Sequence, residues 1–281
     1  MSVVDHIIIA VEDLEKASQD YALMLGRGPS WRGTHPDYGS ANTLFRLDNC
    51  YLELLAANGQ GWAGDMVRGV LEAQGQSLCA LIFATDDCEA FLENARAQGL
   101  NAADPVPGHG IDDNTGVTRT WQTMHWDMAA ARGIFSFCIR HDDLSALPMA
   151  AIEGAGAVTA VDHVVVQTKS AEAAKKFYGD QLGIRLALEQ HVPDWGGTQL
   201  FFRTNSMSVE VLATEKADDD DDRLWGLALK TEDIVATQKR LSDAGIAVTE
   251  VRDGRKPGTK VCTAKSHILD VPTLLIEHPK N

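Results

Sequence analysis

The sequence predicts an α+β protein, and three observations lead to that class. The first half of the chain is repeated in the second half, each half carries a fainter repeat of its own, and each repeating unit reads as a strand, a helix and about three further strands. These four modules are expected near residues 1–57, 76–141, 158–214 and 223–279. Paired in order, they predict two tandem domains, at residues 1–142 and 158–281.

The long repeat has no gaps. His6 opens the first copy and His163 opens the second, and the same number of residues separates each histidine from a glutamate, Glu53 or Glu210. Between these points tyrosine, leucine, glycine, phenylalanine and arginine recur at matching positions. So many coincidences without an insertion indicate a duplicated ancestral unit.

Within a module, local signals predict each element. Residues 5–11 are apolar and β-branched, as a buried strand requires. Asp13 can cap the following helix and Gly26 can end it, and Ser170 and Gly183 take these places in the second copy. Shorter strands are then expected at 28–34, 42–48 and 50–56, and at 185–191, 198–204 and 207–213.

Small residues separate the two copies. The stretch from Ala150 to Ala157 is rich in alanine and glycine and has no helix or strand periodicity. Such a stretch is typical of a linker between domains.

Composition excludes several classes of function. The chain has 25 basic and 40 acidic residues and a net charge of −15, the opposite of what nucleic acids and anionic membranes attract. No run approaches the ~18 apolar residues of a membrane-spanning helix, and no basic-then-apolar secretory signal opens the sequence. Five widely spaced cysteines, an odd number, favour reduced thiols and a cytoplasmic location. We therefore expect a small-molecule partner, and a homodimer stays open.

Three segments carry a resemblance to a known family. The Asp-His opening strands, the segment from His35 to Asn42 and the strand from Tyr51 to Leu55 resemble the vicinal oxygen chelate (VOC) superfamily, and its glyoxalase-like branch in particular. This group includes glyoxalase I, bleomycin-resistance proteins and extradiol dioxygenases. The resemblance implies two tandem glyoxalase-like domains, in each of which two modules form a curled mixed sheet. The concave side of each sheet is called its cup. It also implies a divalent metal (Zn, Ni, Mn or Fe) that holds two adjacent substrate oxygens.

The resemblance further implies metal ligands on the first and last strands of the paired modules. In the second copy these are His163, Glu210 and Glu277, and one of the two glutamates would leave the metal to act as catalytic base. A histidine and a glutamate inside apolar strands suit such a site, because an isolated buried carboxylate is costly. The alternative is that the histidine only hydrogen-bonds its glutamate.

The first copy offers a second candidate site, His6 and Glu53, with Arg140 where the resemblance implies a carboxylate. A guanidinium cannot ligate a cation, so Arg140 would pair with Glu53 or hold an anionic group of the substrate. His141 is expected to face away from the cup, because neighbouring side chains alternate along a strand.

A turn-rich segment supplies candidates for substrate binding. His35, Tyr38 and Asn42 lie in it, and Trp195 lies in the matching segment of the second copy. Polar and aromatic groups on such a segment can line the mouth of a pocket. Ordinary turn chemistry is the alternative.

Two classes of function follow. The first is a metal-dependent enzyme, a lyase or isomerase of glyoxalase type, in which the metal stabilises an enediolate-like charge. A ring-cleaving dioxygenase is a variant of it, but iron there usually needs two histidines and only one is found for each site. The second is a metal-free protein that sequesters a small ligand, as bleomycin-resistance relatives do. Metal content separates the two classes.

Overall fold

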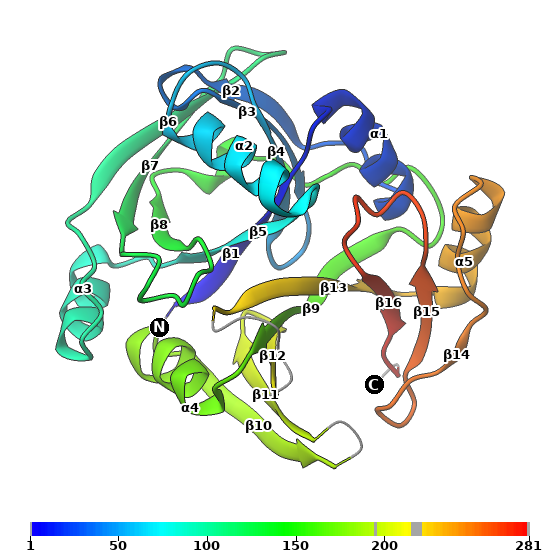
Figure 1. The fold of residues 1–281 in the computed structure, drawn as a ribbon. Coiled ribbons are helices and arrows are strands. Elements are labelled where there is room, and N and C mark those ends of the chain that lie inside the picture. Colours follow the sequence, from blue (N-terminus) through cyan, green and yellow to red (C-terminus); the bar gives the residue numbers. More distant parts are fainter. Residues whose placement is uncertain (1, 194–195, 215–220, 280–281) are drawn as a thin grey trace.

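The computed structural model describes residues 2–193, 196–214 and 221–279. Within these residues sixteen strands form two curled mixed sheets, with few helices around them (Figure 1). The predicted α+β class is confirmed, and so is the succession of four strand–helix–three-strand modules in two tandem pairs.

The first sheet is built by the first two modules. Its strands are β1 (Val3–Ala10), β2 (Trp31–His35), β3 (Ser40–Arg46), β4 (Tyr51–Ala57), β5 (Ser77–Ala84), β6 (Val106–Asp112), β7 (Thr118–His125) and β8 (Phe137–His141). The helices of this half are α1 (Leu14–Leu25), α2 (Trp62–Gln74) and α3 (Cys88–Ala97), with 3-10 turns η1 (Pro36–Tyr38) and η2 (Leu144–Ala146).

This first sheet closes into a barrel, in the strand order β1-β4-β3-β2-β6-β7-β8-β5. The two modules meet twice. β1 pairs with β5 in antiparallel orientation over most of its length, whereas β2 and β6 share only the pairs Gly33 with Asp112 and Thr34 with Ile111. Closure puts the alternate side chains of all eight strands around one interior.

The second sheet is built by the last two modules and stays open. Its strands are β9 (Val158–Thr168), β10 (Arg185–Val192), β11 (Gly197–Thr204), β12 (Met207–Ala213), β13 (Arg223–Thr231), β14 (Arg252–Asp253), β15 (Lys260–Ala264) and β16 (Thr273–Glu277). Their order is β10-β11-β12-β9-β13-β16-β15-β14, so β9 and β13 join the modules and β10 and β14 are the edges. Helix α4 (Ala171–Ala174) runs into the π-helix η3 (Lys175–Gln181), and α5 (Ile234–Asp243) follows β13.

Three of the four helix signals act as predicted, whereas the second-copy helix continues as a π-helix whose C-cap is Leu182, one residue before the predicted stop at Gly183. The side chain of Asp13 accepts a hydrogen bond from the Lys16 backbone N–H and so caps α1. Gly26 ends that helix with φ of 64°, the left-handed conformation that glycine adopts without strain. Ser170 caps α4 through the Ala173 backbone N–H in the same way.

Two segments differ from expectation. Helix α2 lies between the first two modules, where no element was predicted; its N-cap is Gly61, which offers no side chain for a cap. The stretch after residue 149, expected as a linker of small flexible residues, is largely exposed but is held by backbone hydrogen bonds: Ala150 is buried and donates to the Arg46 carbonyl, and Ile152, which is 66% exposed, forms a β-bridge with Arg27. Contacts with the first barrel therefore order this stretch.

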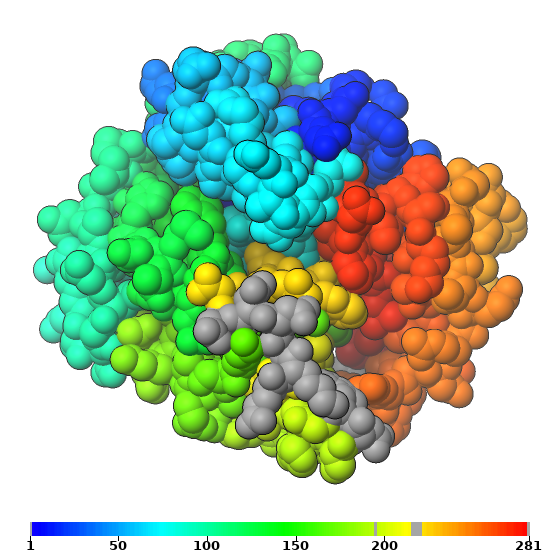
Figure 2. All heavy atoms as spheres, viewed as in Figure 1, coloured from blue at the N-terminus to red at the C-terminus, as the bar shows by residue number. Residues whose placement is uncertain are grey.

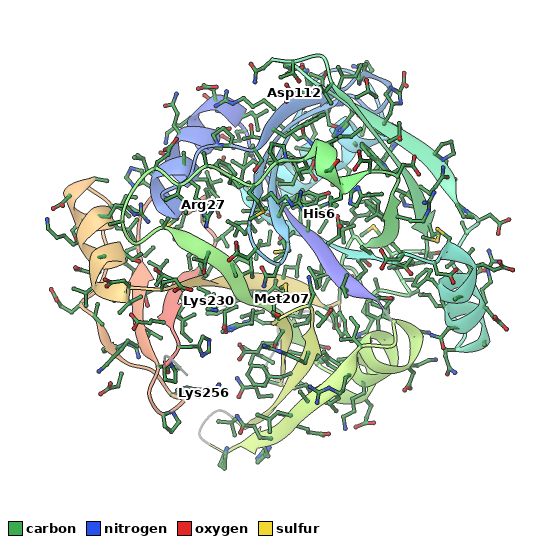
Figure 3. All side chains as sticks on the ribbon, turned by 180° about the vertical axis from the view of Figure 1, so that it is seen from behind. His6, Arg27, Asp112, Met207, Lys230 and Lys256 are labelled. Carbon is green, nitrogen blue, oxygen red and sulfur yellow. The ribbon has the colours of Figure 1, made fainter. Side chains whose placement is uncertain are left out.

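The two sheets share one hydrophobic core, which combines residues around α1 and β5 with residues of β9, β12 and β13. Figure 2 shows the red atoms of the C-terminal strands packed directly beside the cyan and blue atoms of the first half. Arg27, beside the segment that leads into β9 (Figure 3), is buried and donates hydrogen bonds to the carbonyls of Val158 and Ala150. In the described residues, no helix is long and apolar enough to cross a membrane.

Candidate active site in the first barrel

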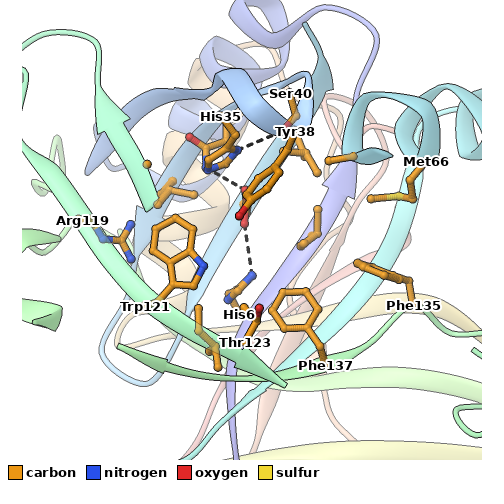
Figure 4. Close-up of a pocket in the computed structure, with 18 of the residues that line it drawn as sticks. His6, His35, Tyr38, Ser40, Met66, Arg119, Trp121, Thr123, Phe135 and Phe137 are labelled. Atoms are coloured by element: carbon orange, nitrogen blue, oxygen red, sulfur yellow. Dashed lines mark hydrogen bonds and ion pairs between the residues drawn. The ribbon is translucent and has the colours of Figure 1, made fainter. Parts of the chain in front are cut away.

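The interior of the first barrel holds a pocket of about 380 Å³. Seven aromatic side chains line it: Trp31, Tyr38, Tyr51, Trp62, Trp121, Phe135 and Phe137. Trp62 and Met66 reach it from α2, which lies across the barrel wall. In Figure 4, Tyr38 and His35 lie at one end of the pocket and His6 at the other, with Trp121 and Phe137 on opposite sides. Such a pocket suits a small molecule with an apolar body.

Strand alternation selects the side chains that face the pocket. On β7, Arg119, Trp121, Thr123 and His125 are alternate residues, and all four line it. Gly108 on the neighbouring β6 leaves the room that the Trp121 indole occupies, because a Cβ there would lie 2.3 Å from the indole Nε1.

The polar part of the pocket is a histidine–glutamate pair. Nε2 of His6 on β1 lies 3.3 Å from Oε2 of Glu53 on β4. Both side chains are buried, with 3% and 6% of the residue exposed. The Asn42 amide on β3 donates to Oε1 of Glu53 at 2.8 Å, so a second neighbour fixes the carboxylate. The Tyr51 ring stacks on the His6 imidazole at 4.4 Å.

Asp5 holds the pair from behind. Its carboxylate lies 2.6 Å from Nδ1 of His6 and 3.0 Å from Nε2 of His141 on β8. Burial alone would raise the pKa of Asp5, but the hydrogen bonds from His141 and His6 hold that pKa well below its usual range. The β1–β5 register shifts between Val4 and His6, and this bulge at Asp5 brings the Asp5 carboxylate within reach of the His6 ring.

These contacts determine where the protons lie. Since Asp5 is ionised, we infer that Nδ1 of His6 carries a proton and donates it to Asp5. Nε2 of a neutral imidazole then has only a lone pair, which cannot face the lone pairs of a carboxylate. Nε2 of His6 and Oε2 of Glu53 lie 3.3 Å apart, so a proton on one of these atoms faces the other.

The second sheet repeats the same set of contacts. Nε2 of His163 lies 3.0 Å from Oε2 of Glu210, and Asp162 accepts from Nδ1 of His163 and Nε2 of His278. Gln199 donates to Glu210, as Asn42 does to Glu53. Burial raises the pKa of Asp162, but hydrogen bonds from His163 and His278 outweigh it and lower that pKa to about 2.

Two predicted site residues face elsewhere. Arg140 pairs with Asp142 at 2.9 Å and is not part of the pocket wall, whereas its neighbour His141 is. Glu277 accepts a hydrogen bond from the Ile234 backbone N–H at the start of α5 and does not join His163 and Glu210. The expected placement of Arg140 and Glu277 was thus wrong by one residue: the next residue in each copy, His141 or His278, contacts the aspartate of the first strand instead.

The donor set does not fit the predicted divalent metal. Among the described residues, no three His, Cys, Asp or Glu side chains are grouped as a metal site requires. His6 faces Glu53 and His163 faces Glu210, but the residues paired with His6 and His163 across the neighbouring module, Ile82 and Ala228, cannot ligate a metal. A catalytic zinc ion ordinarily takes three protein ligands.

The substrate-binding candidates of the first copy lie at the pocket. His35, Tyr38 and Asn42 all line it, and Nδ1 of His35 lies 3.1 Å from the Ser40 hydroxyl. Burial lowers the pKa of His35, which favours the neutral ring. Trp195, the candidate of the second copy, lies outside the described residues.

Sequence reasoning missed several residues of the site: the pocket residues Tyr51, Arg119, Trp121 and His141, and Asp5, which contacts His6 and His141. A signal existed for β7, where Arg119, Trp121, Thr123 and His125 alternate with residues of the outer face. This alternation does not show which other strands face the same pocket, because β7 is brought to the pocket only by closure of the barrel.

Family models for glyoxalase-like domains match both halves of the chain. A model described as "Glyoxalase-like domain" matches residues 4–158, and one described as "Glyoxalase/Bleomycin resistance protein/Dioxygenase superfamily" matches residues 162–263. Comparison with curated proteins gives no significant match.

Three solved structures share the fold. A triple mutant of 4-hydroxymandelate synthase from Streptomyces coelicolor is 16% identical over 100% of this chain and 95% of its own, with a TM-score of 0.71. A hypothetical protein from Staphylococcus aureus is 14% identical over 100% of both chains (TM-score 0.67). A xylose isomerase-like TIM barrel/4-hydroxyphenylpyruvate dioxygenase fusion protein is 15% identical over 99% of this chain and 49% of its own (TM-score 0.64). At these identities the likeness concerns the fold alone, whereas the family models cover both halves, and the chain belongs to the glyoxalase-like proteins of the VOC superfamily.

Proposed function

We propose that the first barrel binds a small molecule with vicinal oxygens and transfers a proton on it, as a lyase or isomerase of glyoxalase type does. The observation that supports this most is the buried His6–Glu53 pair, whose Nε2 and Oε2 atoms lie 3.3 Å apart on the wall of a pocket with seven aromatic side chains. A general base must lie within hydrogen-bond reach of its substrate, and a pair on a pocket wall can be reached by a ligand in that pocket.

Each polar neighbour has a role in this proposal. Glu53 accepts the substrate proton, and Nε2 of His6 faces the Oε2 atom of that carboxylate. Asn42 and Asp5 act as positioning residues, because they fix the carboxylate and the imidazole through hydrogen bonds of 2.8 and 2.6 Å. No step is assigned to a metal, since the side chains present do not supply its ligands.

Proton transfer is testable without knowledge of the natural substrate. Aromatic compounds with vicinal oxygens, such as phenylpyruvate and 2-hydroxyacetophenone, exchange their activated C–H protons for deuterium in D₂O, and NMR follows the rate. We expect the protein to accelerate exchange, and Glu53→Gln to lower that acceleration by at least about 100-fold. Glu210→Gln is the matched control and should leave exchange in the first barrel unchanged. Equal rates in the wild type and Glu53→Gln would contradict the proposal.

A second candidate function is metal-free sequestration of a small ligand. The aromatic lining favours it, because stacking walls hold flat molecules without chemistry. The same experiment separates the two candidates. Probes that bind and quench tryptophan fluorescence, yet exchange no faster than in buffer, would favour a binding protein.

A further inference from the structure

We propose that Arg119 is a carboxylate-binding residue, and that the ligand of the first barrel is therefore a small acid with an apolar body. This proposal deepens the proposed function and rests on the same pocket. Arg119 lies on β7 with its side chain on the pocket wall, and only 5% of the residue is exposed.

The guanidinium of Arg119 is surrounded by rings. Its central carbon lies 5.2 Å from the centre of the Trp31 ring and 5.9 Å from the centres of the Tyr51 and Trp121 rings. Among the described residues none accepts a hydrogen bond from this guanidinium, no carboxylate forms an ion pair with it, and its Nε is buried without a partner. The other buried arginine, Arg27, instead donates to two backbone carbonyls.

An arginine in this state needs a partner that the described chain does not provide. A guanidinium has five N–H donors in a planar fork, and burying it without acceptors is costly even where ring faces attract the charge. A carboxylate satisfies two of these donors at once and neutralises the charge. One guanidinium in a pocket that also holds the Glu53 carboxylate favours a monoanion over a phosphate dianion, because a second negative charge would find no counter-charge.

The position of Arg119 also indicates where the reacting part of the ligand lies. The Tyr51 ring contacts both ends of the polar wall, since it stacks on His6 at 4.4 Å and lies 5.9 Å from the Arg119 guanidinium. Arg119 and the His6–Glu53 pair therefore adjoin the same ring on the pocket wall. In the proposed complex, the atoms next to a carboxylate on Arg119 are presented to the His6–Glu53 pair, as in a 2-oxo or 2-hydroxy acid.

Matched probes test the carboxylate subsite. Benzoate, phenylacetate and 3-phenylpropionate differ from their amides in charge but hardly in shape, and quenching of tryptophan fluorescence reports binding of each. We expect the tightest carboxylate to bind the wild type at least about tenfold more tightly than its amide, as a charge-assisted bidentate contact requires. Arg119→Met should abolish this preference but still bind the amide, and Arg119→Lys should keep part of it.

Arg140→Met is the control, because it removes an arginine of the adjacent strand that lies outside the pocket. It should leave the preference unchanged, and circular dichroism should show that each variant is folded. Amides that bind the wild type as tightly as the acids, or no acid that binds at all, would overturn the proposal. So would a preference that survives Arg119→Met.

The outcomes for Arg119 and for Glu53 are independent. Glu53→Gln should keep the preference for carboxylates while it loses proton exchange. Carboxylate preference without any exchange would reject the proposed proton transfer and leave the Arg119 subsite in place. Exchange on neutral ketones without a preference for carboxylates would reject the Arg119 subsite and leave the proposed proton transfer in place.

Discussion

Asp5 and Asp162 are structural equivalents: each is the bulged residue of the first strand of its sheet, and each accepts hydrogen bonds from two imidazoles. Each also lies one residue before the histidine that faces a buried glutamate. The duplication therefore preserved a set of contacts that spans four strands, in addition to the fold. Neither aspartate has a paired residue on the neighbouring antiparallel strand. The bulge occurs at the site residue in both copies, so we regard it as part of the site.

The first prediction concerns acid stability. The pKa of Asp162 is lowered from 3.8 to about 2 in the folded protein, so its contribution to stability is complete above about pH 4 and is lost as the pH falls towards 2. Asp162→Asn should lower the unfolding free energy at neutral pH by about 2 kcal/mol, and this deficit should shrink between about pH 4 and 2. Urea unfolding across this range measures both quantities.

Asp253→Asn is the matched control for this prediction. Its carboxylate pairs with Lys260 in solvent, with 85% of the side chain exposed, so the substitution should change stability little at any pH. A deficit of Asp162→Asn that stays constant down to about pH 2 would contradict the assignment.

The second prediction concerns metal ions. Since no three ligand side chains are grouped as a metal site in the described part of the chain, chelator-treated protein should keep its thermal midpoint when Zn²⁺, Ni²⁺ or Mn²⁺ is added. Differential scanning fluorimetry measures the midpoint. A metal-dependent rise that disappears in His163→Ala or His6→Ala would show that the cups do bind an ion and would restore the metal-dependent mechanism.

The third prediction concerns the contact between the two halves. Arg27→Met removes a buried donor from the carbonyls of Val158 and Ala150, which should cost about 3 kcal/mol of unfolding free energy. Arg68→Met removes an exposed arginine that pairs with Asp65 and should cost less than about 1 kcal/mol. Chemical denaturation of both variants makes the comparison. Equal effects would mean that Arg27 does not join the halves.

The fourth prediction concerns the thiols. Cys50, Cys79, Cys138 and Cys262 are buried, whereas Cys88 at the start of α3 is partly exposed. Burial raises the pKa of Cys79 to about 12 and of Cys262 to about 11, which keeps these thiols protonated and slow to react. A disulfide reagent should label Cys88 alone in the native protein, and Cys88→Ser should abolish the fast phase. Fast labelling that persists in that variant would contradict the burial of the remaining thiols.

Most of the fold could be predicted because its signals are local and occur twice. Asp13, Gly26 and Ser170 act through neighbours along the chain, so their roles are legible in the sequence. Helix α2 escaped prediction because Gly61 precedes it without a side-chain cap. Closure of the barrel depends on the short pairing of β2 with β6, which no local pattern encodes.

The site was predictable only in part, for a related reason. His6, Glu53 and Asn42 lie on adjacent strands of one module, so the repeat alone brings them together. Arg140 was placed in the cup and His141 outside it, because phase along β8 depends on its pairing with β5 and β7, which the internal alignment does not contain. Arg119 comes from β7, whose counterpart β15 is evident from the strand order but was not aligned with it in the sequence.

Because one sheet is closed and the other open, the two histidine–glutamate pairs of the molecule can be compared with each other. His6 and Glu53 have 4% and 9% of their side chains exposed inside a closed barrel, and His163 and Glu210 have 16% and 11% exposed on an open sheet. One chain thus places a histidine–glutamate pair, with an aspartate and an amide as neighbours in each case, in two surroundings that differ in solvent exposure. Any difference in reactivity between the two pairs measures what exclusion of water contributes, with the covalent chemistry held constant.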